Sequence, residues 1–395
     1  MALAALHPTA FWLDGGQDAT TGWSWIGIGG PERAVDPLET VAAGVAHARA
    51  GAFHGGWVGW MPYDGEAAWL RVDAALAFDH AARRVWAVGT DAPSLRALAD
   101  DALGAPVAAP VPDAQPQGVA SGRHEPAAYA ALIAACREHI REGDAYQLCL
   151  TTRFTVPGTV DPVAVFRRLR RTSASHHAGI IRVGDTALVS ASPERFLEVR
   201  DGSVHTHPIK GTRPRSADPA RDAALAEELR TDAKERAENV MIVDLMRNDL
   251  SRVCAPSSVG VDRLLEVETY PHVHQLVSEV SGRLLPRTTL GALLAATFPA
   301  GSMTGAPKES AMQILARLEG ADRGIYSGTF GWIGDDGAAD LAMVIRSIVV
   351  EQDAAWVGAG GGITWRSVAA SEVAEVGIKA RAPLAALGAE VPPGW

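Results

Sequence analysis

The feature that most constrains the fold is a run of short apolar segments that follow one another with almost no chain between them, from Gly179 to Thr212. The dipeptides Gly184-Asp185 and Asp201-Gly202 separate these segments and are typical of tight turns. Such short connections join antiparallel neighbours, whereas parallel strands need a much longer crossover. The run therefore predicts hairpins in an antiparallel sheet.

Long helices interrupt the strand-like segments. Residues 126–143 carry apolar side chains at helical spacing and end at a glycine, which is a common stop signal. Asp218 and Pro219 begin a helix that we expect to continue to Arg247, and a last helix is expected over residues 367–381. Isolated helices among hairpins are typical of an α+β fold with antiparallel sheets, not of a regularly alternating parallel fold.

The composition excludes several classes of protein. Hydrophobic residues make up 47% and charged residues 21% of the 395 positions, which excludes a disordered or fibrous chain. Lys and Arg total 36 against 46 Asp and Glu, and the net charge of −10 disfavours binding to nucleic acid or to an anionic membrane. Three cysteines without a CxxC pair predict neither a disulfide framework nor a zinc site, and no stretch resembles a membrane span. A cytoplasmic protein is expected.

A Pro/Ala-rich stretch over residues 104–122 divides the chain. Its prolines exclude a helix, so we expect an extended surface connection. The length is compatible with one large domain. In that domain we expect residues 1–122 to form the N-terminal part of the sheets together with this connection, and residues 123–395 to form the region that carries the candidate catalytic residues.

Three charged residues of the last predicted helix share one face. Glu372, Glu375 and Lys379 are spaced i, i+3 and i+7. Alone, this spacing is more typical of a solvated face with an ion pair. The preceding glycines, from Gly358 to Gly362, allow a backbone to approach a ligand closely and favour a site.

A second acidic position lies in the helix that precedes Arg247. Glu238 lies in a largely apolar segment, as do Asp244 and Arg247, and buried charges need partners. For Asp244 and Arg247 an internal ionic network is as good an interpretation as a site. Glu238 and Glu375 together could supply the oxygen ligands that Mg²⁺ prefers.

Lys210 and Glu194 are candidates for covalent and acid–base chemistry. Lys210 follows a strand-like segment and precedes Gly211, so a tight turn could hold its amine facing a cleft. A lysine becomes nucleophilic when desolvation or nearby cations lower its pKa. The simpler alternatives are an exposed lysine and a surface pair of Glu194 with Arg195.

The stretch FPAGSMTGAPK places small residues and hydroxyls ahead of a predicted helix. Free backbone N–H groups there suit an anion such as a carboxylate. The alternative is an ordinary capped turn. The stretch lacks the spacing of a phosphate-binding P-loop, and the chain has no GxSxG motif.

Together these segments resemble one family, the chorismate-utilising enzymes, and within it the branch of aminodeoxychorismate synthase large subunits. The resemblance covers residues 125–387. It implies an α+β fold like that of anthranilate synthase component I, with two antiparallel sheets packed face to face and helices outside. The motifs that carry it are GDAYQLCLTTRF, SASPERFL, PIKGTRPR, AENVMIVDLMRNDL, HQLVSEVSGRL, FPAGSMTGAPK, RGIYSGTFGWIG, MVIRSI and GAGGGITWRSVAASEVAEVGIKA.

The resemblance also implies the site. Glu238 and Glu375 are expected to bind Mg²⁺, which bridges to the ring carboxylate of chorismate, with Glu372 beside the metal through water. Such a dianionic substrate needs cations, backbone donors and metal. The positions expected to hold chorismate are Gly211, Thr212, Thr304, Tyr326, Arg346, Gly358, Ala359, Gly360 and Lys379.

Two positions separate the branches of the family. Isochorismate and salicylate synthases carry a lysine base where this chain has Gln147, and glutamine cannot deprotonate water, so the nucleophile is expected to be ammonia. Anthranilate synthases carry alanine where Lys210 stands. In the resembling branch this lysine adds to ring carbon C2 and expels the C4 hydroxyl, which Glu194 protonates. Ammonia then adds at C4 and displaces the lysine, giving 4-amino-4-deoxychorismate, the precursor of 4-aminobenzoate for folate or secondary metabolism.

Two alternatives remain open: an anthranilate synthase component I and a non-catalytic subunit that binds chorismate. Gln275 stands where anthranilate and isochorismate relatives have a histidine, which disfavours pyruvate elimination, and His274 beside it is expected to point elsewhere. None of the three cysteines, Cys136, Cys149 and Cys254, lies in a glycine-flanked turn like that of a glutaminase. The resemblance therefore implies a separate glutamine amidotransferase subunit as the source of ammonia.

Overall fold

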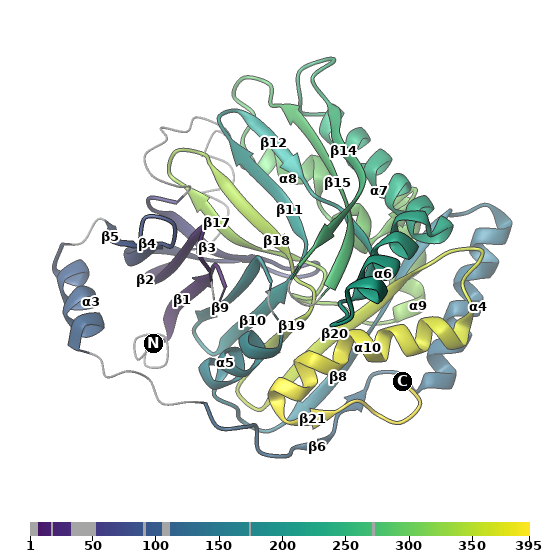
Figure 1. Cartoon of the computed structure of the whole chain (residues 1–395), viewed down its shortest axis with the longest axis horizontal. Coiled ribbons are helices and arrows are strands. Elements are labelled where there is room, and N and C mark those ends of the chain that lie inside the picture. The colour runs from purple at the N-terminus through teal and green to yellow at the C-terminus, as the bar shows by residue number, and fades with distance from the viewer. Residues whose placement is uncertain are drawn as a thin grey trace.

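The computed structural model describes residues 7–16, 19–32, 53–89, 92–104, 111–173, 175–270 and 273–395. Its larger strands form one continuous set of antiparallel pairings with helices on the outside (Figure 1). Three groups of strands make up this set, and the first is N-terminal. Its members are β1 (Thr9–Asp14), β2 (Trp23–Glu32), β3 (Gly56–Met61), β4 (Ala68–Asp79) and β5 (Arg84–Gly89).

The long strand β4 organises the first group. One edge of β4 pairs with β2, and the other edge pairs first with β3 and then with β5. The outer strands of this group continue into the other two groups, because β1 pairs with β9 and β3 pairs with β17. Strands from before and after the Pro/Ala-rich connection therefore share one hydrogen-bonded system.

The second group continues from β1 in the order β9, β10, β19, β20 and β8, and two short strands, β7 and β16, also pair with β8. The turn between β9 and β10 contains the predicted Gly184-Asp185 dipeptide. The members are β7 (Ser121–Gly122), β8 (Gln147–Pro157), β9 (His177–Val183), β10 (Thr186–Ser192), β16 (Gly305–Ala306), β19 (Ser347–Val350) and β20 (Ala354–Ile363).

The third group continues from β3 in the order β17, β18, β11, β12 and β15. Strand β15 pairs with β12 and β13 in succession along one edge and with β14 along the other. The members are β11 (Arg195–Arg200), β12 (Ser203–Thr206), β13 (Ile209–Pro214), β14 (Gly260–Thr269), β15 (Val273–Arg283), β17 (Thr329–Gly334) and β18 (Ala339–Met343).

The helices cover two faces of this system (Figure 1). Helices α4 (Pro126–Glu142), α5 (Pro162–Thr172), α9 (Lys308–Glu319) and α10 (Ala369–Leu387) pack on the second group of strands. Helices α6 (Pro219–Thr231) and α7 (Ala233–Ser251) pack on the third group, and α8 (Leu290–Thr297) packs on α7. Helix α3 (Ala92–Gly104) lies beside β4 and β5, and the parallel pair β6 (Gly118–Val119) and β21 (Ala389–Glu390) lies apart from the main set.

Apolar side chains form two large cores. One lies among the first and third groups of strands, with α7 and α8, and contains Trp69, Phe11 and Phe196. The other lies beneath α4, α5, α9 and α10 and contains Tyr129 and Phe154. The predicted α+β class with antiparallel sheets and outer helices is confirmed. Among the described residues, no helix is both long and apolar enough to cross a membrane.

Several predicted elements differ in detail. The helix expected from Asp218 to Arg247 is wrong as one element, because Asp232 adopts an extended backbone and separates α6 from α7. The Asp232 carboxylate accepts hydrogen bonds from the backbone N–H groups of Lys234 and Glu235, which is an N-cap. The helix after Pro126 ends where expected, since Gly143 adopts a left-handed conformation at φ 88°.

A buried ion pair joins several of these elements. The Arg323 guanidinium, whose side chain is 2% exposed, donates to both carboxylate oxygens of Glu319 at the end of α9, at 2.8 Å each. It also donates to the carbonyl oxygens of Met303 at 2.6 Å and Cys149 at 2.8 Å. Met303 ends the short 3-10 helix η1 (Gly301–Met303). One cation thereby fixes a helix, a strand and a turn.

The N-terminal part of the chain also contacts this cation. The guanidinium lies over the ring of Tyr63, 4.5 Å from its centroid, and the Asp64 carboxylate accepts from the Arg323 backbone N–H at 2.9 Å. Tyr63 and Asp64 follow β3. Arg323 thus connects the β3–β4 turn with β8 and α9.

Substitution Arg323→Leu is expected to destabilise the fold by about 3–5 kcal/mol, because it leaves the Glu319 carboxylate buried and unpaired. Denaturant titration of the free energy of unfolding measures this loss. Arg141→Leu is the matched control, because Arg141 and Glu138 form an exposed ion pair on α4, and its loss is expected to cost less than about 1 kcal/mol. An equal loss of unfolding free energy in the two variants would show that the buried pair stabilises the fold no more than an exposed pair does.

Candidate active site

Two acidic residues of α10 face the glycine-rich strand β20. A Cβ atom placed on Gly361 would lie 3.4 Å from Oε2 of Glu372 and 3.8 Å from Oε1 of Glu375. Glu372 is only 3% exposed. The absence of a side chain at Gly361 therefore leaves room beside both carboxylates, and the alternative of a solvated helix face is excluded for Glu372.

Helix α7 brings a third carboxylate to the same place. Lys234 Nζ lies 3.2 Å from Glu372 Oε1 and 3.7 Å from Glu238 Oε1, so one ammonium connects the two helices. Burial raises the pKa of Glu238, and this effect outweighs the lowering by nearby lysines. Sequence reasoning missed Lys234, although its i, i+4 spacing to Glu238 was a usable signal.

The three carboxylates have the chemistry of a divalent-cation site, although their oxygen atoms do not all lie within 4.8 Å of one another. Glu238 Oε1 is buried and has no hydrogen-bond partner among the described residues. A buried carboxylate oxygen without a donor is costly unless a cation approaches it. Glu238, Glu372 and Glu375 supply hard oxygen ligands of the kind that Mg²⁺ binds. The donor set is therefore compatible with the predicted magnesium site.

Lys379 provides a cation at the edge of the acidic group. Its Nζ lies 2.6 Å from Glu375 Oε1 and donates to the Gly360 carbonyl oxygen at 3.0 Å. Burial raises the pKa of Glu375, but Lys379, Lys234 and Lys210 together lower it more, so the net pKa shift is downward. Glu375 and Lys379 do form the ion pair expected for a solvated helix face. This ion pair, however, lies next to two further carboxylates, those of Glu238 and Glu372.

Lys210 on β13 lies among the acidic residues. Burial lowers the pKa of its amine, whereas the Cys149 side chain and the Glu238, Glu194 and Glu375 carboxylates raise it, and the net shift is upward. The surroundings thus favour the ammonium form in the absence of substrate. Lys210 is partly buried, and its interactions with these charged groups disfavour the alternative of an exposed, idle lysine.

Glu194, between β10 and β11, lies near the same amine. Burial raises the pKa of its carboxyl, and Lys210, Ser302 and Lys379 lower it less, so the net pKa shift is upward and makes the protonated form more accessible. A protonated carboxyl can act as a general acid. The alternative pairing with Arg195 is wrong, because the Arg195 guanidinium donates to Asp340 and Glu198 instead.

Asp244 and Arg247 take no part in the site. Their side chains are 77% and 50% exposed and form a 3.1 Å ion pair on the outer face of α7. The interpretation as an internal network is wrong for this pair, and so is the interpretation as a site. Asp249 is the buried acid of this segment, and it pairs with Lys308 Nζ at 2.6 Å.

The residues expected to hold the substrate have different surroundings. The ring of Tyr326 packs on Gly358, where an added Cβ would lie 2.1 Å from Tyr326 Cγ. Arg346 has φ 51° between β18 and β19, and burial lowers its pKa although Tyr326 and Glu375 raise it. Thr304 is fully buried beside β8, because its carbonyl oxygen accepts from the Cys149 N–H.

Gly211 and Thr212 lie further along β13. Thr212 is exposed, and a Cβ on Gly211 would lie 2.7 Å from Leu229 and 3.1 Å from Glu235. Ala359 lies between Gly358 and Gly360 on β20 and is 2% exposed. The structure thus groups most of the predicted residues around β20, α7 and α10, and it places Gly211 and Thr212 toward the beginning of α7.

Gln147 is a buried amide without a partner. It is fully buried at the start of β8, and neither Nε2 nor Oε1 has a hydrogen-bond partner among the described residues. A Cβ on Gly362 would lie 2.3 Å from its Nε2, so the amide lies against β20. Unpaired buried amides are rare, and one in a site is available to a ligand.

His274 does point away from the candidate site, as expected. Its Nε2 lies 3.0 Å from Asp222 on α6, and its Nδ1 lies 2.9 Å from Thr269 Oγ1. Successive side chains of a strand point to opposite faces, so Gln275 lies on the other face of β15. The His274 imidazole therefore does not take the place of the histidine that relatives have at the position of Gln275.

Comparison with known proteins agrees with this architecture. A family model described as chorismate binding enzyme matches residues 27–385. The crystal structure of anthranilate synthase component I from Streptococcus pneumoniae superimposes with a TM-score of 0.80 at 30% identity, over 92% of each chain. The predicted fold like that of anthranilate synthase component I is confirmed.

The similar proteins are named for one of two different activities. An aminodeoxychorismate synthase of Streptomyces pristinaespiralis is 42% identical in an alignment 366 residues long that covers 85% of this chain and 51% of the relative. An anthranilate synthase component 1 of Streptomyces coelicolor is 40% identical in an alignment 376 residues long that covers 85% of this chain and 73% of the relative. The chain spans about half the length of the Streptomyces aminodeoxychorismate synthases that it matches. It belongs to the chorismate binding enzymes, and within them to the type formed by the anthranilate and aminodeoxychorismate synthase large components.

Proposed function

We propose that this chain converts chorismate and ammonia to 4-amino-4-deoxychorismate. The observation that carries the proposal is the lysine at position 210, a partly buried residue whose amine interacts with the Glu194, Glu238 and Glu375 carboxylates. The identity of 42% to an aminodeoxychorismate synthase supports the same reaction. A lysine here offers a covalent route that the alanine of anthranilate synthases does not.

The proposed reaction uses Lys210 as nucleophile and Glu194 as acid. The neutral amine forms a bond to C2 of chorismate, the ring double bonds shift, and the C4–O bond breaks. The leaving hydroxyl takes the Glu194 proton and departs as water. Ammonia then forms a bond to C4, the bond between C2 and the lysine nitrogen breaks, and the product retains its pyruvyl group.

The remaining residues bind charge. We assign the Glu238, Glu372 and Glu375 carboxylates to Mg²⁺, which when bound supplies positive charge for the ring carboxylate of chorismate. Arg346, Lys379 and the backbone of β20 are assigned to the substrate carboxylates. The buried Gln147 amide is assigned to the nucleophile, because it can hydrogen-bond ammonia but cannot take a proton from water.

Anthranilate formation is the second candidate. It is supported by the relative from Streptomyces coelicolor, at 40% identity, and by the structural match to anthranilate synthase component I. Anthranilate formation eliminates pyruvate, whereas 4-amino-4-deoxychorismate retains its pyruvyl group. The two products also differ in fluorescence. Anthranilate fluoresces directly, whereas 4-amino-4-deoxychorismate gives 4-aminobenzoate only after a separate lyase is added. Product analysis with and without that lyase decides between the two.

Substitution Lys210→Ala is expected to abolish most 4-amino-4-deoxychorismate formation, since the covalent intermediate can no longer form. Chorismate affinity is expected to change much less. Mass analysis of a quenched wild-type reaction should show an adduct on the peptide that contains Lys210. Lys210→Arg is the control that keeps the positive charge, and it should be as inactive as Lys210→Ala. Turnover near the wild-type rate in Lys210→Ala would refute the covalent route.

Substitution Glu238→Gln or Glu375→Gln removes one anionic ligand, so the Mg²⁺ concentration needed for half-maximal activity should rise and the rate should fall strongly. Glu372→Gln should have a weaker effect, because it is assigned to a contact through water. Asp244→Asn is the matched control on the exposed face of α7. Wild-type Mg²⁺ titration curves in all three site variants would contradict the assignment.

The purified chain is expected to use ammonium but not glutamine, and to use glutamine only when a separate amidotransferase subunit is added. Burial raises the pKa of Cys136 to about 12 and that of Cys254 to about 11, and it also raises the pKa of Cys149, so all three remain inert thiols at neutral pH.

The rate with ammonium should climb as the pH rises toward the pKa of ammonium, since only the neutral form has a free electron pair. The raised pKa of Lys210 acts in the same direction. Hydrolysis of glutamine by the chain alone would overturn the predicted need for a partner. A rate independent of pH at constant total ammonium would exclude neutral ammonia as the reactant.

A further inference from the structure

A second group of metal-ligating side chains lies on the third group of strands. His205 comes from β12, Glu279 from β15 and Asp262 from β14, and their ligand atoms lie within 4.8 Å of one another. His207, just after β12, lies beside them, because its Nε2 is 3.4 Å from Glu279 Oε1. Two imidazoles and two carboxylates thus gather on one face of the sheet.

The spacing of these atoms fits a tetrahedral ion. Zinc bonds of about 2.0–2.1 Å to nitrogen and oxygen require ligand atoms about 3.3–3.4 Å apart in a tetrahedron. Glu279 Oε1 lies 3.1 Å from His205 Nδ1 and 3.4 Å from His207 Nε2. Glu279 Oε1 therefore lies at ligand spacing from each of the two imidazoles.

The imidazole of His207 is prepared to act as a ligand. Its Nδ1 is buried without a partner, and Glu279 is its polar contact among the described residues. The Arg195 guanidinium nearby is already paired with Asp340 and Glu198, so its charge is compensated.

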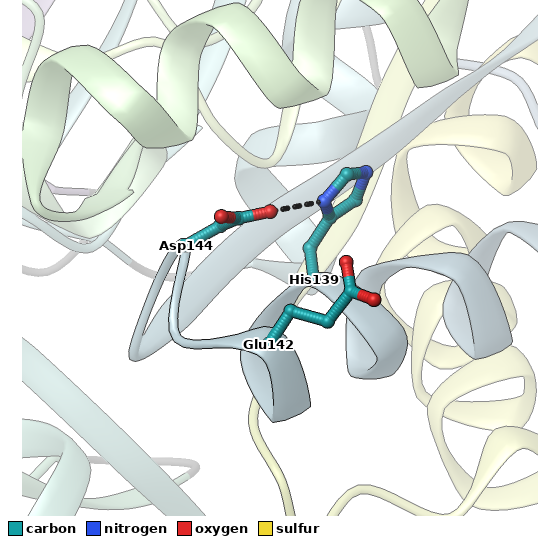
Figure 2. Close-up of side chains that lie close together, drawn as sticks. All are labelled: His139, Glu142 and Asp144. Carbon is teal, nitrogen blue, oxygen red and sulfur yellow. Dashed lines mark hydrogen bonds and ion pairs between the residues drawn. The ribbon is translucent and has the colours of Figure 1, made fainter.

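A different cluster offers a comparison. Figure 2 shows His139 and Asp144 joined by a hydrogen bond of 2.7 Å at the end of α4, with Glu142 beside them. This group contains one imidazole, and the Glu142 and Asp144 side chains are 54% and 47% exposed. Fewer imidazoles and more exposed carboxylates make it the weaker candidate for a transition metal.

We propose that His205, His207, Glu279 and Asp262 form a binding site for a divalent transition metal of the zinc type. The ion connects β12, β14 and β15 and acts as a structural tie. Since β15 also pairs with β13, the tie holds the strand that carries Lys210. The absence of a CxxC pair predicted no zinc site, but that prediction considered only thiolate ligands. The proposed site uses nitrogen and oxygen ligands.

The test uses the full chain stripped of metal with a chelator. Zinc affinity is measured by competition with a chromophoric chelator, and Co²⁺ is then added to record visible absorption typical of a tetrahedral site. Loss of an outer-shell partner alone costs about 10–100-fold in affinity, so we expect at least about 100-fold weaker binding in His205→Ala and in Glu279→Gln. Zinc is also expected to raise the melting temperature of the wild type but not of these variants.

Two control variants locate the binding. His139→Ala removes the imidazole of the α4 cluster, and Glu238→Gln removes a carboxylate of the candidate magnesium site. Both should keep the zinc affinity and the Co²⁺ spectrum of the wild type. The proposal is overturned if either control loses the tight binding, if His205→Ala and Glu279→Gln bind as the wild type does, or if the wild type binds no zinc. Circular dichroism of the stripped variants verifies that they are folded.

Discussion

The structure depends on one buried ion pair, that of Glu319 and Arg323. A charge in the interior is tolerable only when all of its hydrogen-bonding capacity is used, and Arg323 uses its capacity on groups from separate parts of the chain. The carboxylate of Glu319 in turn accepts from the Thr151 N–H at 2.8 Å. Strand β8, helix α9 and the turn before Thr304 can therefore shift only together. Because β8 also carries Gln147, the pair fixes one wall of the candidate active site.

The other walls are held by opposite charges. Two carboxylates of α10, Glu372 and Glu375, lie beside Gly361. Lys234 connects Glu372 with Glu238 of α7, and Lys379 pairs with Glu375, so these two cations reduce the repulsion among the carboxylates. Such an arrangement is costly without cations, and Glu238 Oε1 still lacks a hydrogen bond although Lys234 Nζ lies 3.7 Å away. A substrate that brings two carboxylates, together with a metal that brings positive charge, would complete the balance. The same local charges that suit binding also hold Lys210 as an ammonium in the free protein.

Local sequence signals predicted most helices and strands, whereas contacts between residues far apart in the sequence could not be predicted. Turn dipeptides and the stop at Gly143 depend on neighbouring residues, so hairpins and helix ends could be recognised. The break at Asp232 had a local signal too, an aspartate three residues before Glu235, but continuous helical periodicity masked it. Spacing along α10 placed Glu372 and Glu375 on one face, and the motifs supplied Glu238 and Lys210. No pattern linked Arg323 to Cys149 or joined His205 to Glu279, since these partners are far apart in sequence and meet only through strand pairing.

The pairing of β1 with β9 and of β3 with β17 has a consequence for exchanging parts between relatives. The Pro/Ala-rich connection resembles a natural cutting point, but a chimera joined there must supply both matching strand edges at once. A donor segment with a different register at either edge would turn its apolar side chains toward the wrong face and leave a free edge open to aggregation. Recombination within this family should therefore succeed only where the two edges are inherited as a set.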